Sequence, residues 1–138
     1  MNPVEFEKSP IEYSVLIYEL GEPGDEIEAA VIRFEGTYGY GSLGNGDAIY
    51  MIAIRDYVID CVLPCAIVFD LTLLHYEWGN GIWGLFGCDG IPVGTVTSEK
   101  CSGFETCAVA EPTFDSVELA LQHLRPLARE YERKILED

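Results

Sequence analysis

The chain is short of basic residues. It holds 24 aspartates and glutamates against 8 lysines and arginines, which gives a formal net charge of −16 at pH 7. Half of the bases, Arg125, Arg129, Arg133 and Lys134, lie near the C-terminus. A field of this sign repels nucleic acid and anionic membranes and attracts basic surfaces. The charge therefore favours a protein partner with a basic surface, although acidic composition also simply raises solubility.

Long apolar runs are also missing. No stretch reaches the roughly 20 residues of a membrane span, and residues Met1–Glu7 lack the basic start and apolar run of a secretion signal. We therefore expect a cytoplasmic protein without membrane association. Its 138 residues, 49% of them hydrophobic, suit a single domain over residues 1–138, with the core at about 12–125 and a helix reaching residue 138.

Spacings typical of metal sites or catalytic groups are absent from the sequence. The five cysteines include the close pairs Cys61 with Cys65 and Cys101 with Cys107, but neither pair has C-x-x-C spacing. Without an export signal, such thiols are expected to be reduced and buried as small apolar side chains. No serine or cysteine stands beside a histidine and an orienting acid. We therefore predict no metal, no cofactor and no catalytic residue.

What the chain does contain is an alternation of strand and helix patterns. Runs rich in β-branched and apolar residues predict strands at 12–20, 29–36, 66–71, 92–97 and 107–110. Helical spacing and capping residues predict helices at 48–60, at 81–86 and after residue 115. A hairpin followed by αβαβ units predicts an α/β domain, with a mixed sheet and helices packed on it.

Capping patterns add detail to two of these helices. Asp47 is a candidate N-cap for the first one, and Pro64 is expected to end it. Asp115 and Glu118 form a capping box for the last one, which Pro126 is expected to kink or restart. The predicted apolar faces consist of Ile49, Ile52, Ala53 and Tyr57 in the first helix, and of Val117, Ala120, Leu121 and Leu124 in the last.

The loop after the second strand contains a literal G-x-G-x-x-G at Gly39, Gly41 and Gly44, and the acid Asp70 ends the next strand. Such glycines can let a backbone approach a pyrophosphate at a helix N-terminus. The alternative is a loop whose tyrosines pack on the sheet. The sequence leaves both interpretations open, although the surrounding negative charge opposes a diphosphate.

Residues 70–86, DLTLLHYEWGNGIWGLF, resemble the signature of the STAS domain of sulfate transporters and anti-sigma-factor antagonists. In that signature a buried strand ends in Asp-Leu-Ser, and Asp-Ser-Ser-Gly-Leu then opens a helix. Residues 70–72 match the first part, and Gly81 with Ile82 match the Gly-Leu. The resemblance implies a regulatory or antagonist module that binds a partner. Asn80 stands where antagonists carry a phosphorylated serine, so a phosphoswitch of that type is expected to be absent.

We predict that the partner binds at the turn between the third strand and the following helix. Open α/β sheets bind ligands at such strand ends, and exposed aromatic side chains are frequent interface hot spots. His75 and Glu77 are expected to point to one side of the strand. The alternative is that the aromatic residues complete the core. The predicted site residues are Glu77, Trp78, Gly79, Asn80, Gly81 and Trp83.

The sequence therefore predicts a non-catalytic, acidic protein-binding module with a STAS-like fold. Two other interpretations stay open. The composition also suits an immunity protein that neutralises a basic toxin. Residues 91–104, IPVGTVTSEKCSGF, resemble the crotonase-like spiral core, which implies a small enzyme with a backbone oxyanion hole. The sequence gives no indication of the oligomeric state.

Overall fold

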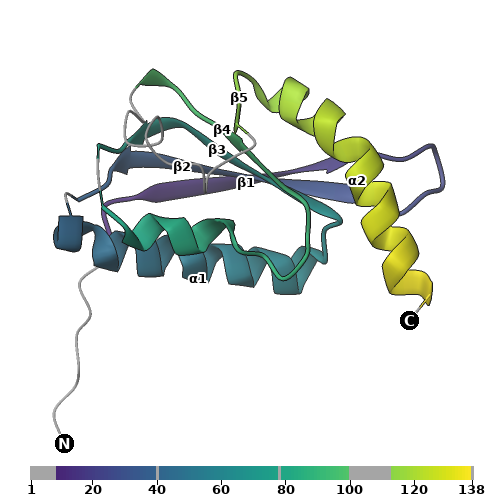
Figure 1. The fold of residues 1–138 in the computed structure, drawn as a ribbon, viewed down its shortest axis with the longest axis horizontal. Coiled ribbons are helices and arrows are strands. Elements are labelled where there is room, and N and C mark those ends of the chain that lie inside the picture. Colours follow the sequence, from purple (N-terminus) through teal and green to yellow (C-terminus); the bar gives the residue numbers. More distant parts are fainter. Residues whose placement is uncertain (1–8, 40, 78, 100–112, 138) are drawn as a thin grey trace, which may run out of the picture.

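The computed structural model describes residues 9–39, 41–77, 79–99 and 113–137, which form a sheet with helices packed on it (Figure 1). The α/β class predicted from the sequence is confirmed. In chain order the elements are β1 (Glu12–Glu19), β2 (Glu28–Thr37), the 3₁₀ helix η1 (Gly41–Gly44), α1 (Asn45–Val62), β3 (Ala66–His75), the 3₁₀ helix η2 (Gly81–Phe86), β4 (Val93–Val96), β5 (Thr113–Phe114) and α2 (Val117–Glu137). The strand expected at 107–110 lies outside the described residues.

The five strands lie in chain order, β1-β2-β3-β4-β5. β1 runs antiparallel to β2, and the pairs β2–β3, β3–β4 and β4–β5 are parallel. The sheet is therefore mixed, as a hairpin followed by crossover connections predicts. β3 extends four residues beyond the predicted end at Leu71, and its first six residues are buried because helices cover both faces there.

Two helical layers enclose the sheet. α1 and η2 cover one face, where Ile32 and Phe34 of β2 meet Met51 of α1 and Ile82 of η2. α2 covers part of the other face, where residues of the alternate set on the same strands form a second cluster. That cluster includes Ala29, Val31, Ala66, Val68, Ala120, Leu121, Leu124 and Ala128. Figure 1 shows α1 and η2 together on one side and α2 crossing at one end of the sheet.

The start and orientation of α1 differ from the sequence prediction. The helix begins at Asn45, because η1 runs directly into it, so Asp47 lies inside the first turn and is not the N-cap. Its buried carboxylate instead accepts hydrogen bonds from the Ser9 hydroxyl (2.6 Å) and from the Gly39 N–H (3.0 Å). The end is as predicted, since Leu63 adopts a left-handed conformation (φ 52°) directly before Pro64.

The predicted apolar face of α1 is also wrong. Ile49, Ala53 and Tyr57 are exposed, and the buried residues are Asp47, Ala48, Met51, Arg55 and Val58. Apolar residues occur on most sides of this helix, so their spacing fits more than one face. The buried face also carries the charged residues Asp47 and Arg55, so apolar periodicity alone does not identify it as the buried face.

α2 has the predicted apolar face but a different cap. Ala120, Leu121 and Leu124 are buried, with Val117 packed beside them. The helix begins at Val117, and the Ser116 hydroxyl oxygen accepts a bond from the Leu119 N–H (3.2 Å). Ser116, rather than Asp115, is therefore the cap. The helix continues unbroken through Pro126, so it does not restart there.

Candidate functional site: the outer strand β1 and its groove

The turn predicted as the binding site is mostly filled by its own packing. Gly79 is buried, and its carbonyl oxygen accepts a short hydrogen bond from the Tyr76 hydroxyl. Trp83 is half-buried, with its ring centroid 6.0 Å from that of Tyr76. A Cβ on Gly81 would lie 3.0 Å from the Asn45 side-chain oxygen, so α1 closes off this position.

The remaining residues of this turn are more accessible. Glu77 and Asn80 are exposed, and Trp78 lies outside the described residues. His75 Nε2 lies 3.3 Å from Glu77 Oε1, which confirms that these two side chains share one side of the strand. The predicted residues that the structure describes thus lie in one turn, and among them only Glu77 and Asn80 have exposed side chains.

The glycines of the G-x-G-x-x-G loop have a packing role. A Cβ on Gly44 would collide with the Tyr38 ring, and one on Gly39 would lie 2.8 Å from the Leu43 backbone. Tyr38 itself is 1% exposed and packs edge-on against Tyr76, with ring centroids 5.1 Å apart. Gly44 therefore leaves room for the buried Tyr38 ring and Gly39 for a close approach of the loop backbone, which supports the packed-loop interpretation over the nucleotide-binding one.

One surface that packing leaves open is the outer strand β1, which pairs with β2 alone among the described strands. Large apolar side chains are exposed on both of its faces: Tyr13 46%, Leu16 53%, Ile17 44% and Tyr18 38%. Neither helical layer reaches far enough to cover them. An exposed strand edge with an apolar surface is a common site of strand pairing with another chain.

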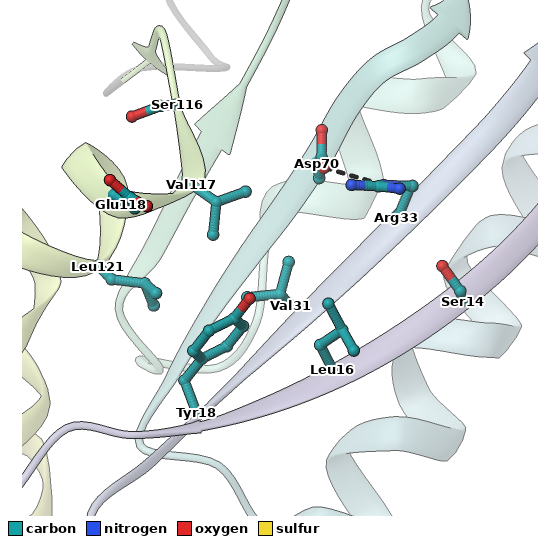
Figure 2. A pocket seen from close by; sticks show the side chains of 10 residues that line it. All are labelled: Ser14, Leu16, Tyr18, Val31, Arg33, Asp70, Ser116, Val117, Glu118 and Leu121. Carbon is teal, nitrogen blue, oxygen red and sulfur yellow. Dashed lines mark hydrogen bonds and ion pairs between the residues drawn. The ribbon is translucent and has the colours of Figure 1, made fainter.

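A groove of about 390 Å³ lies between the β1–β2 face and the first turns of α2 (Figure 2). Leu16 and Tyr18 of β1 and Val31 of β2 form its apolar floor, and Val117 and Leu121 form its wall. Ser14, Arg33, Asp70, Ser116 and Glu118 complete the lining. The groove can thus accept an apolar side chain on the α2 side of β1.

An ion pair closes the polar end of this groove. Arg33 Nε donates to Asp70 Oδ2 at 3.0 Å, and the other carboxylate oxygen accepts from the Thr72 N–H (3.1 Å) and hydroxyl (2.7 Å). The Asp70 side chain is 3% exposed and that of Arg33 is 46% exposed. The buried Asp70 carboxylate needs a positively charged partner. The ion pair therefore holds the Arg33 side chain in place at the groove.

Glutamates frame β1 at both ends. Glu12 lies opposite Glu35 and Glu19 lies opposite Glu28 in the β1–β2 register. Like charges directly opposite each other destabilise a strand pair. Neither pair has an ion-pair partner among the described residues, so both leave negative charge beside the exposed apolar side chains. The apolar spacing predicts the hairpin, but it carries no signal for the exposure of the outer strand.

A second, smaller cleft of about 250 Å³ lies between the C-terminal ends of α1 and α2. Ile59, Leu63, Ile91 and Tyr131 make most of it apolar. Cys65 lies in its lining, and burial first, with the nearby Glu132 charge second, raises the pKa of that thiol, while a hydrogen bond with the Glu28 backbone opposes the rise. A thiol with a raised pKa is a poor nucleophile near neutral pH.

The other described cysteines are Cys61 and Cys88. Cys88 is buried, as expected, and burial also raises its pKa. Cys61, in the last turn of α1, is exposed, contrary to the expectation of buried thiols. Cys101 and Cys107 lie outside the described residues.

No family model matches the chain, and no curated protein or solved structure is significantly similar to it. The STAS-like and crotonase-like resemblances therefore stay predictions. Within the described ranges, no group of three or more His, Cys, Asp or Glu side chains is placed to hold a metal ion. Among the same residues, no helix combines the length and apolar character needed to cross a membrane.

Proposed function

We propose that the protein is a non-catalytic binding module that docks a basic protein partner on β1. The observation that carries this proposal is the exposure of Tyr13, Leu16, Ile17 and Tyr18 on one edge strand between glutamates at both ends. Apolar side chains in the centre of a contact and charged side chains at its rim are the usual anatomy of a protein interface.

The charge of the whole molecule supports the same kind of partner. A net charge of −16 accelerates the approach of a positively charged protein and opposes that of nucleic acid. Attraction at the rim sets the association rate, and apolar contact at the centre sets the lifetime of the complex. A cytoplasmic location and the absence of a nucleic-acid partner belong to this proposal.

The proposal keeps the protein-binding function expected from the sequence, but its main contact is β1 and not the turn at residues 77–83. The resemblance to STAS antagonists and the interpretation as an immunity protein both imply binding of another protein. The turn at residues 77–83 stays a predicted contact, but among its described residues fewer side chains are exposed than on β1.

The test is a comparison of three forms of the full chain, each used to capture proteins from an extract of the source cells. They are the unchanged chain, Glu12→Lys with Glu19→Lys, and the matched control Asp60→Lys with Glu137→Lys. Both variants change the net charge equally, but only the first changes β1. We expect a basic protein on the unchanged chain and the control, and its loss from the β1 variant.

Two results would contradict the proposal. Equal loss from both variants would show that only the total charge matters. Equal retention by both would show that the partner docks elsewhere, and Asn80→Arg would then test the predicted turn. The melting temperature of each variant shows whether its fold is intact.

A further inference from the structure

We propose that the partner adds a β-strand to the free edge of β1, using a short extended apolar segment with lysine or arginine at both ends. This inference rests on the proposed function and specifies the partner segment and its binding mode. Strand addition draws its affinity from backbone hydrogen bonds and its specificity from alternate side chains. Three features of β1 carry the inference: its free backbone groups, its two apolar faces and the charges at its ends.

The hydrogen-bond pattern identifies the free backbone groups. The Leu20 N–H donates to the Ile27 carbonyl oxygen at 2.8 Å, and this pair continues the β1–β2 register. Hydrogen-bonded and non-hydrogen-bonded pairs alternate along an antiparallel ladder. Residues 14, 16 and 18 therefore direct their backbone groups to β2, while Tyr13, Val15 and Ile17 direct theirs away from the sheet.

The side chains of β1 offer an apolar contact on each face. Leu16 and Tyr18 point into the groove beside α2. Tyr13 and Ile17 alternate with them and point to the α1 side, where Val15 packs against the core. A strand added beside β1 also has alternating side chains, so its apolar residues would meet an apolar neighbour on either face.

The negative charges at the ends of β1 favour basic residues at the ends of the added segment. Glu12 begins β1 and Glu19 ends it, with Glu35 and Glu28 opposite them on β2. A basic residue at each end of the added strand would face these carboxylates, whichever direction that strand runs. The centre of β1, from Tyr13 to Tyr18, has no charged side chain, so the matching stretch is apolar.

The same charges oppose a second copy of the chain at this edge. If two β1 strands aligned antiparallel about their centres, Glu12 of each copy would lie opposite Glu19 of the other. Parallel alignment would place identical glutamates side by side. Two molecules of −16 each also repel one another, so the edge suits a basic segment and not itself.

The test measures binding of a defined probe, the peptide Lys-Lys-Val-Thr-Val-Thr-Val-Lys-Lys with a fluorescent label, to the full chain. We expect saturable binding below about 1 mM by fluorescence anisotropy. Two control peptides accompany it. One has glutamates in place of the lysines, and the other is N-methylated at alternate residues, which removes its strand-forming N–H groups. Both should bind at least about tenfold more weakly.

Variants of the protein test the same bonds from the other side. Ile17→Pro removes an N–H that points away from β2, a position where an edge strand tolerates proline. Ile17→Ala is the matched control, because it removes the side chain but keeps the N–H. We expect Ile17→Pro to weaken binding at least about tenfold beyond the effect of Ile17→Ala, with similar melting temperatures.

Amide hydrogen exchange gives a readout that does not depend on a variant. In the free chain, the amides of residues 14, 16 and 18 should exchange slowly and those of Tyr13, Val15 and Ile17 quickly. On binding the lysine peptide, the second set should become protected. This change would not accompany docking on a face of the sheet alone.

Strand addition is overturned if the N-methylated peptide binds as well as the lysine peptide, or if Ile17→Pro behaves like Ile17→Ala. Absence of binding by the lysine peptide would also overturn it. A chain that sediments as a dimer, and becomes a monomer with Ile17→Pro, would show that a second copy occupies the edge. In each case the capture experiment with the Glu12 and Glu19 variant still decides whether β1 docks a protein at all.

Discussion

Tyr38 shows how burial and a neighbouring charge act on a single side chain. Its ring fills the space that Gly44 leaves free, and the Asp47 carboxylate, which holds Ser9 and Gly39, lies near its hydroxyl group. Burial first, and the Asp47 charge second, raise the pKa of Tyr38 to about 12, with the Ile82 backbone opposing them. The neutral hydroxyl is therefore the form that the folded chain stabilises.

This pKa predicts a loss of stability at alkaline pH. The folded pKa lies above the unfolded value of about 10. The contribution of Tyr38 is thus complete below pH 10 and declines as the pH rises from about 10 to 12, by roughly 1–3 kcal/mol in the free energy of unfolding. Urea unfolding at several alkaline pH values would measure the decline. Tyr38→Phe should show a shallower one, and identical slopes for both chains would contradict the assignment.

At the scale of elements, η2 depends on α1 for its position. A 3₁₀ helix of six residues has weak internal hydrogen bonds and cannot hold its own place. Arg55 of α1 supplies the link, because its Nη1 donates to the carbonyl oxygens of Gly84, Leu85 and Gly87 at 2.8, 2.9 and 3.1 Å. Asp56 fixes the other side of the guanidinium group at 2.8 Å.

We expect Arg55→Met to lower the free energy of unfolding by roughly 2–4 kcal/mol, since it leaves these carbonyl groups without their donor. Methionine keeps much of the apolar stem, so the loss reports mainly on hydrogen bonds. Arg129→Met, at an exposed position of α2, is the matched control and should change stability by less than about 0.5 kcal/mol. Chemical denaturation of both variants checks this, and equal effects would show that Arg55 is not a structural link.

The strands were more predictable from the sequence than the details of the helices. Residues 66–71 are apolar except for Asp70, which is typical of a strand buried on both faces, and residues 29–36 begin with the four apolar residues 29–32. The face of α1 was not predictable from apolar spacing, because Asp47 points inward to the Gly39 N–H and Arg55 to the Leu85 carbonyl oxygen, contacts that only the fold creates. The cap of α2 shifted to Ser116, the neighbour of Asp115, since either side chain can bond the first turn.

At the scale of the whole molecule, negative charge opposes compactness. The described ion pairs involve few of the 24 acidic residues.

The open face of β1 was not predictable from the sequence, because exposure depends on how far α1 and α2 extend across the sheet. Residues 77–83 are adjacent in sequence and were easy to recognise as a group. Leu16, Val31 and Leu121 come together only through the fold.

Because the excess negative charges of the folded chain repel one another, we expect added salt to stabilise it. Raising NaCl from about 0.01 M to 0.1 M shortens the Debye length from roughly 30 Å to 10 Å and weakens the repulsion among carboxylates. The melting temperature should rise by a few degrees, which corresponds to about 1 kcal/mol for a domain of this size. Circular dichroism would measure it. The Asp60→Lys with Glu137→Lys variant should gain less, and a melting temperature that falls with salt would mean that ion pairs outweigh the repulsion.

The sequential order of the strands bears on how the chain is made. Because β1-β2-β3-β4-β5 follows the order of synthesis, each new strand joins the edge left by its predecessor. The hairpin and β3 can therefore pair while the rest of the chain is still on the ribosome. During this time each new strand pairs with the edge that the previous strand left open, whereas none of the described strands pairs with the outer side of β1. A partner segment that meets the growing chain would thus find β1 already paired with β2 before α2 has emerged.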